Sequence, residues 1–211
     1  FGAGFTSAVP IALVQRSKWG CVLEEWLVMA AIKDSLELDR YLVGRIRSKW
    51  PDDEKHLFIK LFANFLGTIH EFGVFHTDLK TCNIIVTNPN LGVMSISPEI
   101  NDFNPVSFSL IDYDDVRYFS SGVNMEKRAK NLAQLFLSTP SDINLADRSE
   151  FLRLYLDVCA KNPDYGAKLL KAAKKRMKGK TLLYVGPDGD ITEDWPQHGL
   201  EECCYHGLGK S

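Results

Sequence analysis

The alternation of apolar and polar positions predicts two paired strands near the start of the chain. The apolar residues 11–14 are followed by turn-forming residues 16–20 and then by a second apolar, extended stretch at residues 21–28. Two such runs joined by a short turn are typical of a β-hairpin. Residues 34–37, Asp-Ser-Leu-Glu, have the spacing of a capping box, which predicts that a helix begins there.

The strongest helical pattern follows Pro51 and ends at Gly73. Pro51 and the three acids after it suit a first helical turn, because the helix dipole favours negative charge there. Apolar side chains then recur with a helical period, at Leu57, Phe58, Leu61, Phe62, Phe65, Leu66 and Ile69. A stripe this apolar predicts a helix buried at the centre of its domain.

Short strands and further helices are predicted for the second half of the chain. Residues 84–86 and 106–111 have the character of short strands, and the Asn-, Pro- and Ser-rich stretch 87–105 predicts a loop or hairpin excursion between them. From about Asn124 the chain becomes helical. Its apolar positions there include Leu132, Leu135, Phe136, Phe151, Leu152, Tyr155 and Val158. This order of elements does not alternate as βαβ units, so the predicted fold class is α+β.

Composition and charge narrow the class of protein. The 211 residues are 45% hydrophobic and 25% charged, which excludes a disordered or fibrous chain. The longest apolar runs, such as residues 26–32, are too short to span a bilayer. A net charge of −2 argues against a general nucleic-acid binder, so no nucleic-acid partner is expected. The five cysteines include no Cys-x-x-Cys pair, which favours free thiols in a reducing compartment and a cytoplasmic location.

One polar stretch has the residue types that phosphoryl transfer needs. Residues 76–83 read His-Thr-Asp-Leu-Lys-Thr-Cys-Asn, and the next short strand ends at Asp112. In such a site one carboxylate takes the proton of the attacking hydroxyl, an amide and a second carboxylate hold magnesium, and a cation neutralises the phosphoryl group. A tight loop from Asp78 to Asn83 lets both side chains face one cleft. An Asx-type turn that only stabilises the loop is the alternative for these two residues.

These residues resemble the catalytic loop and the metal-binding aspartate of the protein-kinase-like fold. More narrowly, the chain resembles the lipopolysaccharide core kinase family, which phosphorylates Kdo or heptose sugars. The supporting segments are residues 9–12, 26–28, 76–80, 110–112, 128–135 and 151–156. The resemblance covers about residues 8–178. It implies a protein-kinase-like fold with a mostly helical C-lobe, preceded by the last two strands of a truncated N-lobe.

The resemblance also implies a domain organisation and a role for each site residue. Residues 1–32 would be the remnant of the N-lobe strands with the hinge, residues 33–180 the kinase-like C-lobe, and residues 181–211 an irregular C-terminal tail. Asp78 would be the catalytic base, and Lys80 would contact the transferred phosphate. The other implied contacts are those of ATP with Met29, Ala31, Asn83 and Asp112, and those of Mg2+ with Asn83 and Asp112.

Several residues depart from the family pattern. Thr77 stands where many protein kinases have arginine, which argues against control by a phosphorylated activation loop. Asp114 and Asp115 either add a second metal contact or form an exposed acidic turn. Asn131 stands where the family usually has an aspartate that buttresses the catalytic loop, and an asparagine can still hydrogen-bond there. His76 is expected to pack and to hydrogen-bond the loop backbone rather than to react.

Motifs that are missing from the sequence also guide the interpretation. No glycine-rich hairpin, strand lysine or helical glutamate partner precedes the hinge-like segment, so we expect the chain to be part of a longer enzyme. The short stretch from Asp112 to Asn124 lacks the long activation segment with which protein kinases hold peptides, which favours a sugar or glycolipid acceptor. An atypical protein Ser/Thr kinase and a pseudokinase or scaffold that binds without turnover are the alternatives. A metal hydrolase would need more clustered ligands than the chain offers.

A run of basic residues follows the predicted helices. Its members are Lys168, Lys171, Lys174, Lys175, Arg176, Lys178 and Lys180. Helical spacing places Lys168, Lys171 and Lys175 on one face. This face is either a solvated surface, as most charge runs are, or a patch that meets anionic lipid or a phosphorylated glycolipid. In the second case the protein would be peripheral at the inner face of a bacterial inner membrane.

Overall fold

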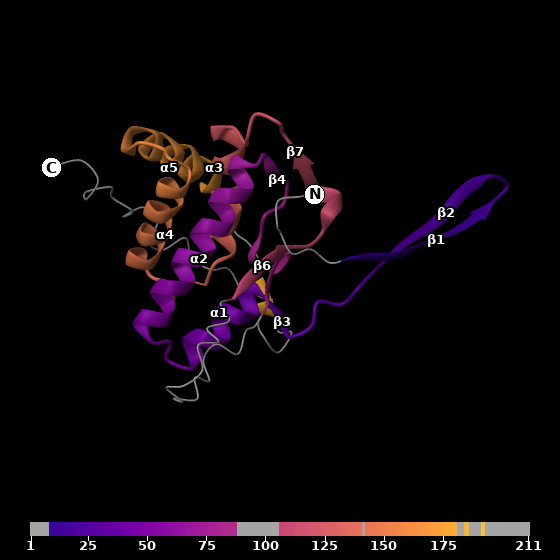
Figure 1. Ribbon diagram of the computed structural model, residues 1–211, viewed down its shortest axis with the longest axis horizontal. Coiled ribbons are helices and arrows are strands. Elements are labelled where there is room, and N and C mark those ends of the chain that lie inside the picture. The colour runs from indigo at the N-terminus through magenta and orange to yellow at the C-terminus, as the bar shows by residue number, and fades with distance from the viewer. Residues whose placement is uncertain (1–8, 88–105, 141, 181–183, 186–190, 193–211) are drawn as a thin grey trace, which may run out of the picture.

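The computed structural model describes residues 9–87, 106–140, 142–180, 184–185 and 191–192, and it confirms the α+β class. A helical body carries small antiparallel sheets, and a long hairpin projects from it (Figure 1). The helices are α1 (Leu38–Arg47), α2 (Asp52–Glu71), α3 (Met125–Ser138), α4 (Leu145–Val158) and α5 (Pro163–Met177), with short 3-10 turns η1 (Thr81–Asn83) and η2 (Tyr113–Asp115). The strands are β1 (Pro10–Lys18), β2 (Cys21–Met29), β3 (Ser35–Glu37), β4 (Val74–His76), β5 (Ile84–Thr87), β6 (Ser107–Leu110), β7 (Val116–Tyr118), β8 (Tyr184–Val185) and β9 (Ile191–Thr192).

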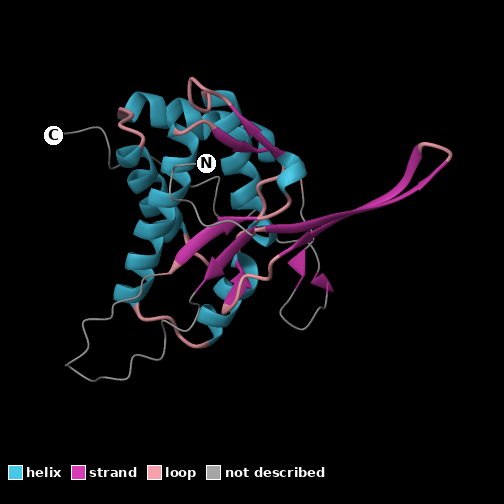
Figure 2. Ribbon diagram, turned by 45° about the vertical axis from the view of Figure 1, so that its right-hand side comes forward, coloured by secondary structure: helices cyan, strands magenta, loops and turns pink. Residues whose placement is uncertain are grey.

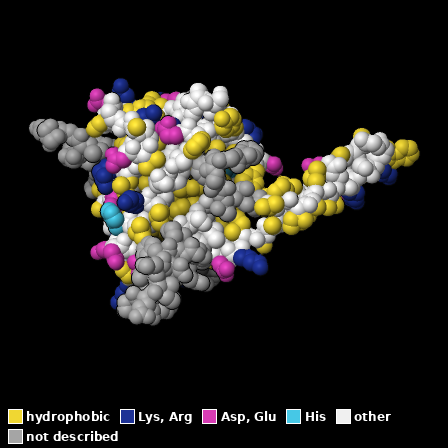
Figure 3. All heavy atoms as spheres, viewed as in Figure 1, with side chains coloured by type: hydrophobic (Ala, Val, Ile, Leu, Met, Phe, Trp, Pro, Cys, Tyr) yellow, Lys and Arg dark blue, Asp and Glu magenta, His cyan; other side chains and the backbone are white. Residues whose placement is uncertain are grey.

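The predicted hairpin is confirmed as β1 and β2, which pair antiparallel along their whole length. Trp19 and Gly20 form its two-residue turn, with φ angles of 57° and 80°, and such tight hairpin turns require this left-handed geometry. The hairpin stands away from the helical body in both ribbon views (Figure 2). Its apolar side chains, among them Leu13 and Leu27, remain exposed, and Figure 3 shows them along the projecting arm.

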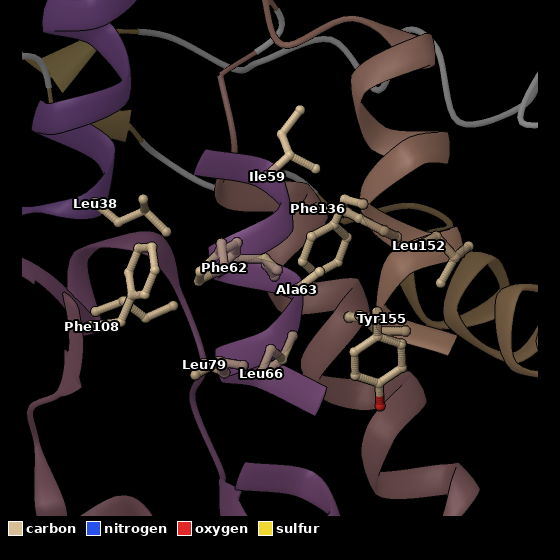
Figure 4. Close-up of a cluster of buried hydrophobic side chains, with 14 of the residues drawn as sticks. Leu38, Ile59, Phe62, Ala63, Leu66, Leu79, Phe108, Phe136, Leu152 and Tyr155 are labelled. Atoms are coloured by element: carbon tan, nitrogen blue, oxygen red, sulfur yellow. The ribbon is translucent and has the colours of Figure 1, made fainter. Parts of the chain in front are cut away.

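Helix α2 is the buried central helix that the apolar stripe predicts. Its inner face packs on α4, where the ring of Phe62 stacks on that of Phe151 with centroids 5.4 Å apart. A Cβ atom at Gly67 would lie 2.6 Å from Cγ1 of Val158, so glycine at this position permits the close approach of the two helices. Figure 4 shows the core around them, which includes Leu38, Ile59, Ala63, Leu66, Leu79, Phe108, Phe136, Leu152 and Tyr155.

The predicted capping box at residues 34–37 is wrong. Leu36 pairs with Val86, so residues 35–37 form strand β3 at the edge of a three-stranded sheet with the order β3–β5–β6. Helix α1 begins only at Leu38, and the side chain of Glu37 makes no capping hydrogen bond. Antiparallel pairing with β5 holds this segment extended, and backbone pairing of this kind is not visible in a four-residue spacing.

The three helices of the second half are confirmed, and each begins at an asparagine. The side chains of Asn124, Asn144 and Asn162 accept hydrogen bonds from the backbone N–H groups three residues further on, at 2.9–3.0 Å. Asparagine is among the preferred N-caps because its side-chain oxygen satisfies an N–H group that has no partner within the helix. Helix α3 packs on α5, as α2 does on α4.

Parts of two predicted segments lie outside the described residues. Of the loop predicted at 87–105, only Thr87 is described, and it ends β5. Most of the tail 181–211 is also outside, and the two short strands described within it, β8 and β9, pair antiparallel. Two-residue strands are too short for alternation to reveal them. The described cysteines are free, and no described helix is long and apolar enough to cross a membrane.

Candidate active site

Residues 76–83, which carry the sequence motif, are called the motif loop. The chain reverses direction between α2 and the motif loop at a position that only glycine can occupy. Gly73 follows the end of α2 with a φ of +84°, and a Cβ atom there would lie 1.8 Å from the backbone oxygen of Phe119. Strand β4 starts at the next residue and pairs with β7, which was not predicted. This pairing carries the chain out of the helix and delivers His76 and the loop after it to one end of the body.

The loop from Asp78 to Asn83 closes on itself through hydrogen bonds. The backbone oxygen of Asp78 accepts from the Lys80 N–H at 2.9 Å and from Nδ2 of Asn83 at 2.8 Å. The Asn83 N–H in turn donates to the oxygen of Lys80 at 3.0 Å. The Nδ2 atom of Asn83 therefore stabilises the loop, as the alternative stated for this residue expects. Within the described residues, its Oδ1 atom meets only the weak Sγ donor of Cys82 at 3.8 Å, so this oxygen retains its capacity to bind a cation.

Both carboxylate oxygens of Asp78 have partners. Nζ of Lys80 lies 2.8 Å from Oδ2, and Nε2 of Gln134 on α3 donates to Oδ1 at 3.3 Å. About a third of each side chain of the Lys80–Asp78 pair remains exposed, at 34% and 35%. A solute can therefore reach this carboxylate while the protein holds its orientation.

The imidazole of His76 is buried and has a structural role, as expected. Its Nδ1 accepts from the N–H of Asp78 at 3.1 Å, and its Nε2 lies 2.9 Å from the backbone oxygen of Ile111. Because Nδ1 accepts and Nε2 faces an acceptor, the two partners assign the ring proton to Nε2. His76 thus links the loop to the end of β6, one residue before Asp112.

Asp112 adopts a conformation that is unusual for a residue with a side chain. It follows β6 with φ 62° and ψ 60°, in the left-handed region, which costs on the order of 1–2 kcal/mol outside glycine. The preceding residue, Ile111, donates its N–H to the oxygen of Asn83 at 3.0 Å, so the two predicted metal-binding residues are attached to adjoining segments. Within the described chain the exposed carboxylate of Asp112 has no hydrogen-bond or ion-pair partner. Strained backbone of this kind is concentrated at functional sites.

The two acids after Asp112 differ in their surroundings. Asp115 is bound to Thr77 twice, because its backbone oxygen accepts the Thr77 N–H at 2.7 Å and its carboxylate accepts the Thr77 hydroxyl. Asp114 is exposed in η2, as an acidic turn would place it. Thr77, which replaces the arginine of many protein kinases, therefore joins the loop to η2. Nothing in these contacts favours a second metal contact from either acid.

A magnesium ion fits the residues present at the site. No group of three or more His, Cys, Asp or Glu side chains that would hold a metal exists among the described residues. Mg2+ at kinase sites does not need three protein ligands of this kind. One or two protein oxygens bind it, and substrate phosphates and water complete its coordination shell. The Oδ1 atom of Asn83 and the carboxylate of Asp112 are oxygen donors of that kind.

A chain of buried polar groups supports the loop from behind. Nδ2 of Asn131 donates to the backbone oxygen of His76 at 2.5 Å, so this asparagine buttresses the loop as the sequence suggested. Its Oδ1 meets Nε2 of His70 at 3.1 Å, and Nδ1 of His70 meets the hydroxyl of Tyr155 at 2.8 Å. Burial, with the nearby charge of Arg128, lowers the pKa of His70 from 6.5 to about 3, so the ring is neutral and each nitrogen has one role.

Sequence reasoning did not identify Gln134, Ser138, His70 and Tyr155 as supports of the site. The Ser138 hydroxyl accepts the Thr81 N–H at 2.9 Å, and its backbone oxygen accepts the Thr81 hydroxyl at 2.9 Å. The only signal in the sequence was that Gln134 lies one helical turn after Asn131. The two predicted ATP contacts, Met29 and Ala31, lie at the end of β2 and in the link to β3, and no interaction joins them to Asp78 or Asp112 among the described residues.

The loop and Asp112, whose carboxylate has no partner within the described chain, have the residue types that phosphoryl transfer needs, and comparison with known proteins gives a family of kinases. Residues 3–155 match the model of the lipopolysaccharide kinase (Kdo/WaaP) family, so the chain belongs to this family. Its members are kinases, and the resemblance stated from the sequence is confirmed. A solved structure of WaaP in complex with acyl carrier protein is similar in fold, with a TM-score of 0.57, 19% identity, and coverage of 82% of this chain and 70% of that chain. No curated protein matches the sequence.

Proposed function

We propose that the protein transfers the γ-phosphoryl group of Mg·ATP to a hydroxyl of a Kdo or heptose sugar in the lipopolysaccharide core. The observation that carries this proposal is the arrangement of Asp78. Its carboxylate is reachable from solvent, is held at both oxygens, and is joined through His76 and Asn83 to the strand end that bears Asp112. Membership of the family supports a sugar hydroxyl as the acceptor.

The residues of the loop divide the chemistry of such a transfer between them. The acceptor hydroxyl gives its proton to Asp78 while its oxygen forms a bond to the γ-phosphorus. The bond from that phosphorus to the β–γ bridging oxygen breaks, and its electron pair leaves on ADP. Lys80, 2.8 Å from the same carboxylate, would turn from it to contact the transferred phosphoryl group. Asn83 and Asp112 would hold Mg2+, which neutralises charge on the phosphates when bound.

The kinase-like arrangement of lobes is part of this proposal. Residues 1–32 would contribute the strands and hinge of an N-lobe, and residues 33–180 the C-lobe, with Met29 and Ala31 as hinge contacts for ATP. The hairpin that stands apart from the helical body, and its direct connection to the segment of Met29 and Ala31, support this division. The similarity in fold to WaaP supports it as well.

The segment after Asp112 favours a small acceptor over a peptide. It passes through η2 and β7 and reaches the N-cap of α3 at Asn124, and β7 is paired with β4. Peptide kinases hold their substrate on a long activation segment that follows the metal-binding aspartate. In this chain the residues after Asp112 form the short elements η2 and β7 instead. An atypical protein kinase or a scaffold without turnover are the remaining candidates.

The lysine face of α5, defined as Lys168, Lys171 and Lys175, supports a peripheral membrane location. All three side chains are exposed, and a shallow surface hollow is lined by Lys168, Lys171, Ala172, Lys174, Lys175 and Lys178. Anionic lipid attracts basic residues at its surface by about 1 kcal/mol each. We therefore expect the protein to bind the anionic inner face of the bacterial inner membrane. Co-sedimentation with vesicles that is independent of their anionic lipid content would contradict this location.

A transfer assay tests the proposed activity. The full-length protein is incubated with radiolabelled ATP, Mg2+ and either dephosphorylated lipopolysaccharide core oligosaccharide or a generic peptide. Label is expected on the oligosaccharide alone, and it is expected to disappear in Asp78→Asn, which keeps the size of the side chain. Asp157→Asn, on the exposed face of α4, is the matched control and should retain activity. Label on the peptide would favour the protein kinase, and binding of ATP without transfer would favour the scaffold.

A further inference from the structure

The side chain of Gln134 reaches from α3 to three consecutive residues of the motif loop. Its Nε2 donates to the backbone oxygen of Thr77 at 2.8 Å and to Oδ1 of Asp78 at 3.3 Å. Its Oε1 accepts the N–H of Leu79 at 3.2 Å and Nδ2 of Asn131 at 3.2 Å. Within the part of the chain that the structure describes, the hydrogen bonds of this amide therefore go either to the loop or to the residue that buttresses it.

The contacts determine which way the amide of Gln134 points. Two acceptors, the oxygens of Thr77 and Asp78, face one end, and two donors, the N–H groups of Leu79 and Asn131, face the other. A flipped amide would place an NH2 group against donors and an oxygen against acceptors, which would leave all four contacts unfavourable. The NH2 group is consequently fixed toward the carboxylate of Asp78.

Lys80 and Gln134 hold the two oxygens of Asp78 in different ways. Lys80 is a loop residue with a flexible charged side chain, and the proposed transfer requires it to turn toward a phosphoryl group. Gln134 belongs to a helix, is tied to Asn131, and has no charge that a phosphate would attract. When Lys80 contacts the phosphoryl group, the bond from Gln134 to Oδ1 is the one that keeps the carboxylate in place.

From this geometry we infer that Gln134 is a positioning residue, which orients the carboxylate of Asp78 toward the acceptor hydroxyl. This inference rests on the proposed function of Asp78 as the base. It adds a residue on α3 to the transfer machinery that acts through Asp78 and does not itself touch the substrate. A displacement of about 1 Å in a reacting group can cost about 100-fold in rate, so the loss of one orienting contact is measurable.

The fold of the loop does not depend on Gln134 alone. Asn131 holds the backbone at His76, before the three contacted residues, and Ser138 holds it at Thr81, after them. Replacement of Gln134 should therefore leave both ends of the loop anchored and disturb residues 77–79 between them. Variants at this position are expected to fold, which makes the role of Gln134 separable from general stability.

Gln134→Glu is the most informative variant, because it keeps the size of the side chain and places an oxygen opposite Oδ1 of Asp78. Lys80, His76 and Cys82, which are ionisable groups beside Asp78, are unchanged in this variant. A second carboxylate at this place repels the carboxylate of Asp78 and removes the hydrogen bond that orients it. We expect kcat to fall at least about tenfold, with KM for ATP within about twofold of the wild type.

The test also includes a measurement that does not need turnover. Calorimetry measures the affinity for Mg·ATP of the wild-type full-length protein, Gln134→Glu and Gln134→Met. The three affinities should agree within about twofold, because Gln134 acts on the residue that faces the acceptor. Gln134→Met, which removes the hydrogen bonds without adding a charge, should lower kcat as well. Lys130→Gln, one turn earlier on α3, is the matched control and should behave as the wild type.

The outcomes separate this inference from the proposed function. An active enzyme in which Gln134→Glu retains the wild-type kcat would overturn the positioning role, and so would a variant that loses affinity for Mg·ATP as much as it loses kcat. A wild type that transfers no phosphate to the core oligosaccharide would overturn the proposed function instead. If Gln134→Glu does not fold, Gln134→Met decides, and wild-type kcat in that variant would overturn the positioning role.

Discussion

Nε2 of His76 donates a hydrogen bond to the backbone oxygen of Ile111 at 2.9 Å, across a buried boundary between β4 and β6. The other nitrogen of the same ring accepts the N–H of Asp78. One imidazole therefore sets the positions of the proposed base and of the residue before Asp112, which is proposed to bind the metal. This histidine can be essential to catalysis without exchanging a proton with the substrate.

Replacement of this ring by an apolar side chain should destabilise the fold. In His76→Leu the backbone oxygen of Ile111 and the N–H of Asp78 lose a buried partner, and each unsatisfied group costs about 1–3 kcal/mol. We expect the free energy of unfolding to fall by about 2–4 kcal/mol, measured by urea denaturation at pH 7.5. An equally stable His76→Leu protein would show that water replaces the ring at no cost.

Removal of the unpartnered carboxylate of Asp112 should weaken nucleotide binding only when magnesium is present. Asp112→Asn keeps the shape of the side chain, and asparagine tolerates the left-handed backbone. Calorimetry with full-length protein should give an affinity for Mg·ATP at least about tenfold weaker than the wild type, a difference of about 1.4 kcal/mol. The affinity for ATP in the presence of EDTA should change little. Equal losses in both conditions would place Asp112 away from the metal.

The buried, neutral His70 should make the fold sensitive to mild acid. The folded state keeps this ring unprotonated down to a pKa of about 3, whereas an unfolded histidine takes up a proton near pH 6.5. The unfolded state thus binds more protons between these two values. The contribution of His70 to stability is complete above pH 6.5, and it declines by about 1.4 kcal/mol per pH unit as the pH falls below that value.

Urea denaturation at pH 7.5, 6, 5 and 4.5 measures this dependence. His70→Gln should be less stable than the wild type at pH 7.5 but should lose less stability on acidification. His56→Gln, which removes an exposed histidine from the same helix, is the matched control. Parallel pH dependences for the wild type and His70→Gln would contradict the assignment of a neutral buried ring.

Two glycines in neighbouring helices should respond to alanine in opposite directions. At Gly67 the new Cβ would meet Val158 at 2.6 Å, so Gly67→Ala overpacks the contact between α2 and α4 and should cost about 1–3 kcal/mol. At Gly44 in α1 nothing lies within 4 Å, and Gly44→Ala should stabilise the helix by about 0.5–1 kcal/mol. Thermal denaturation of the two variants measures both effects. Stabilisation in both would mean that helix propensity decides at Gly67 too, and destabilisation in both would contradict the prediction for Gly44.

The sequence was sufficient to predict the elements with a strong period and the residues that resemble a known motif. The apolar stripe of α2 and the turn between β1 and β2 are local patterns, and Asp78, Asn83 and Asp112 carry residue types that suit one chemistry. Strand β3 was not predictable in the same way, because three residues contain too little alternation and their partner, β5, lies some 50 positions away.

The supports of the loop were hidden for a different physical reason. Gln134 and Ser138 act through side chains that cross from α3 to the loop, and that contact depends on how the helix docks. His70 lies in α2, and the apolar pattern of that helix fits an ordinary core residue at this position equally well. Its partner Tyr155 is 85 residues further along the chain, a separation at which no local pattern operates.

The hairpin β1–β2 has a practical consequence for handling the protein. Leu13 lies opposite Leu27, and Val14 lies opposite Trp26. Each face of the arm therefore exposes a cross-strand pair of hydrophobic side chains to solvent. Exposed strands with such side chains are prone to stack edge to edge, and concentrated samples should therefore precipitate through this arm. The double variant Leu13→Lys, Leu27→Glu would keep a cross-strand pair and make this face of the arm hydrophilic. It is a rational starting point for crystallisation.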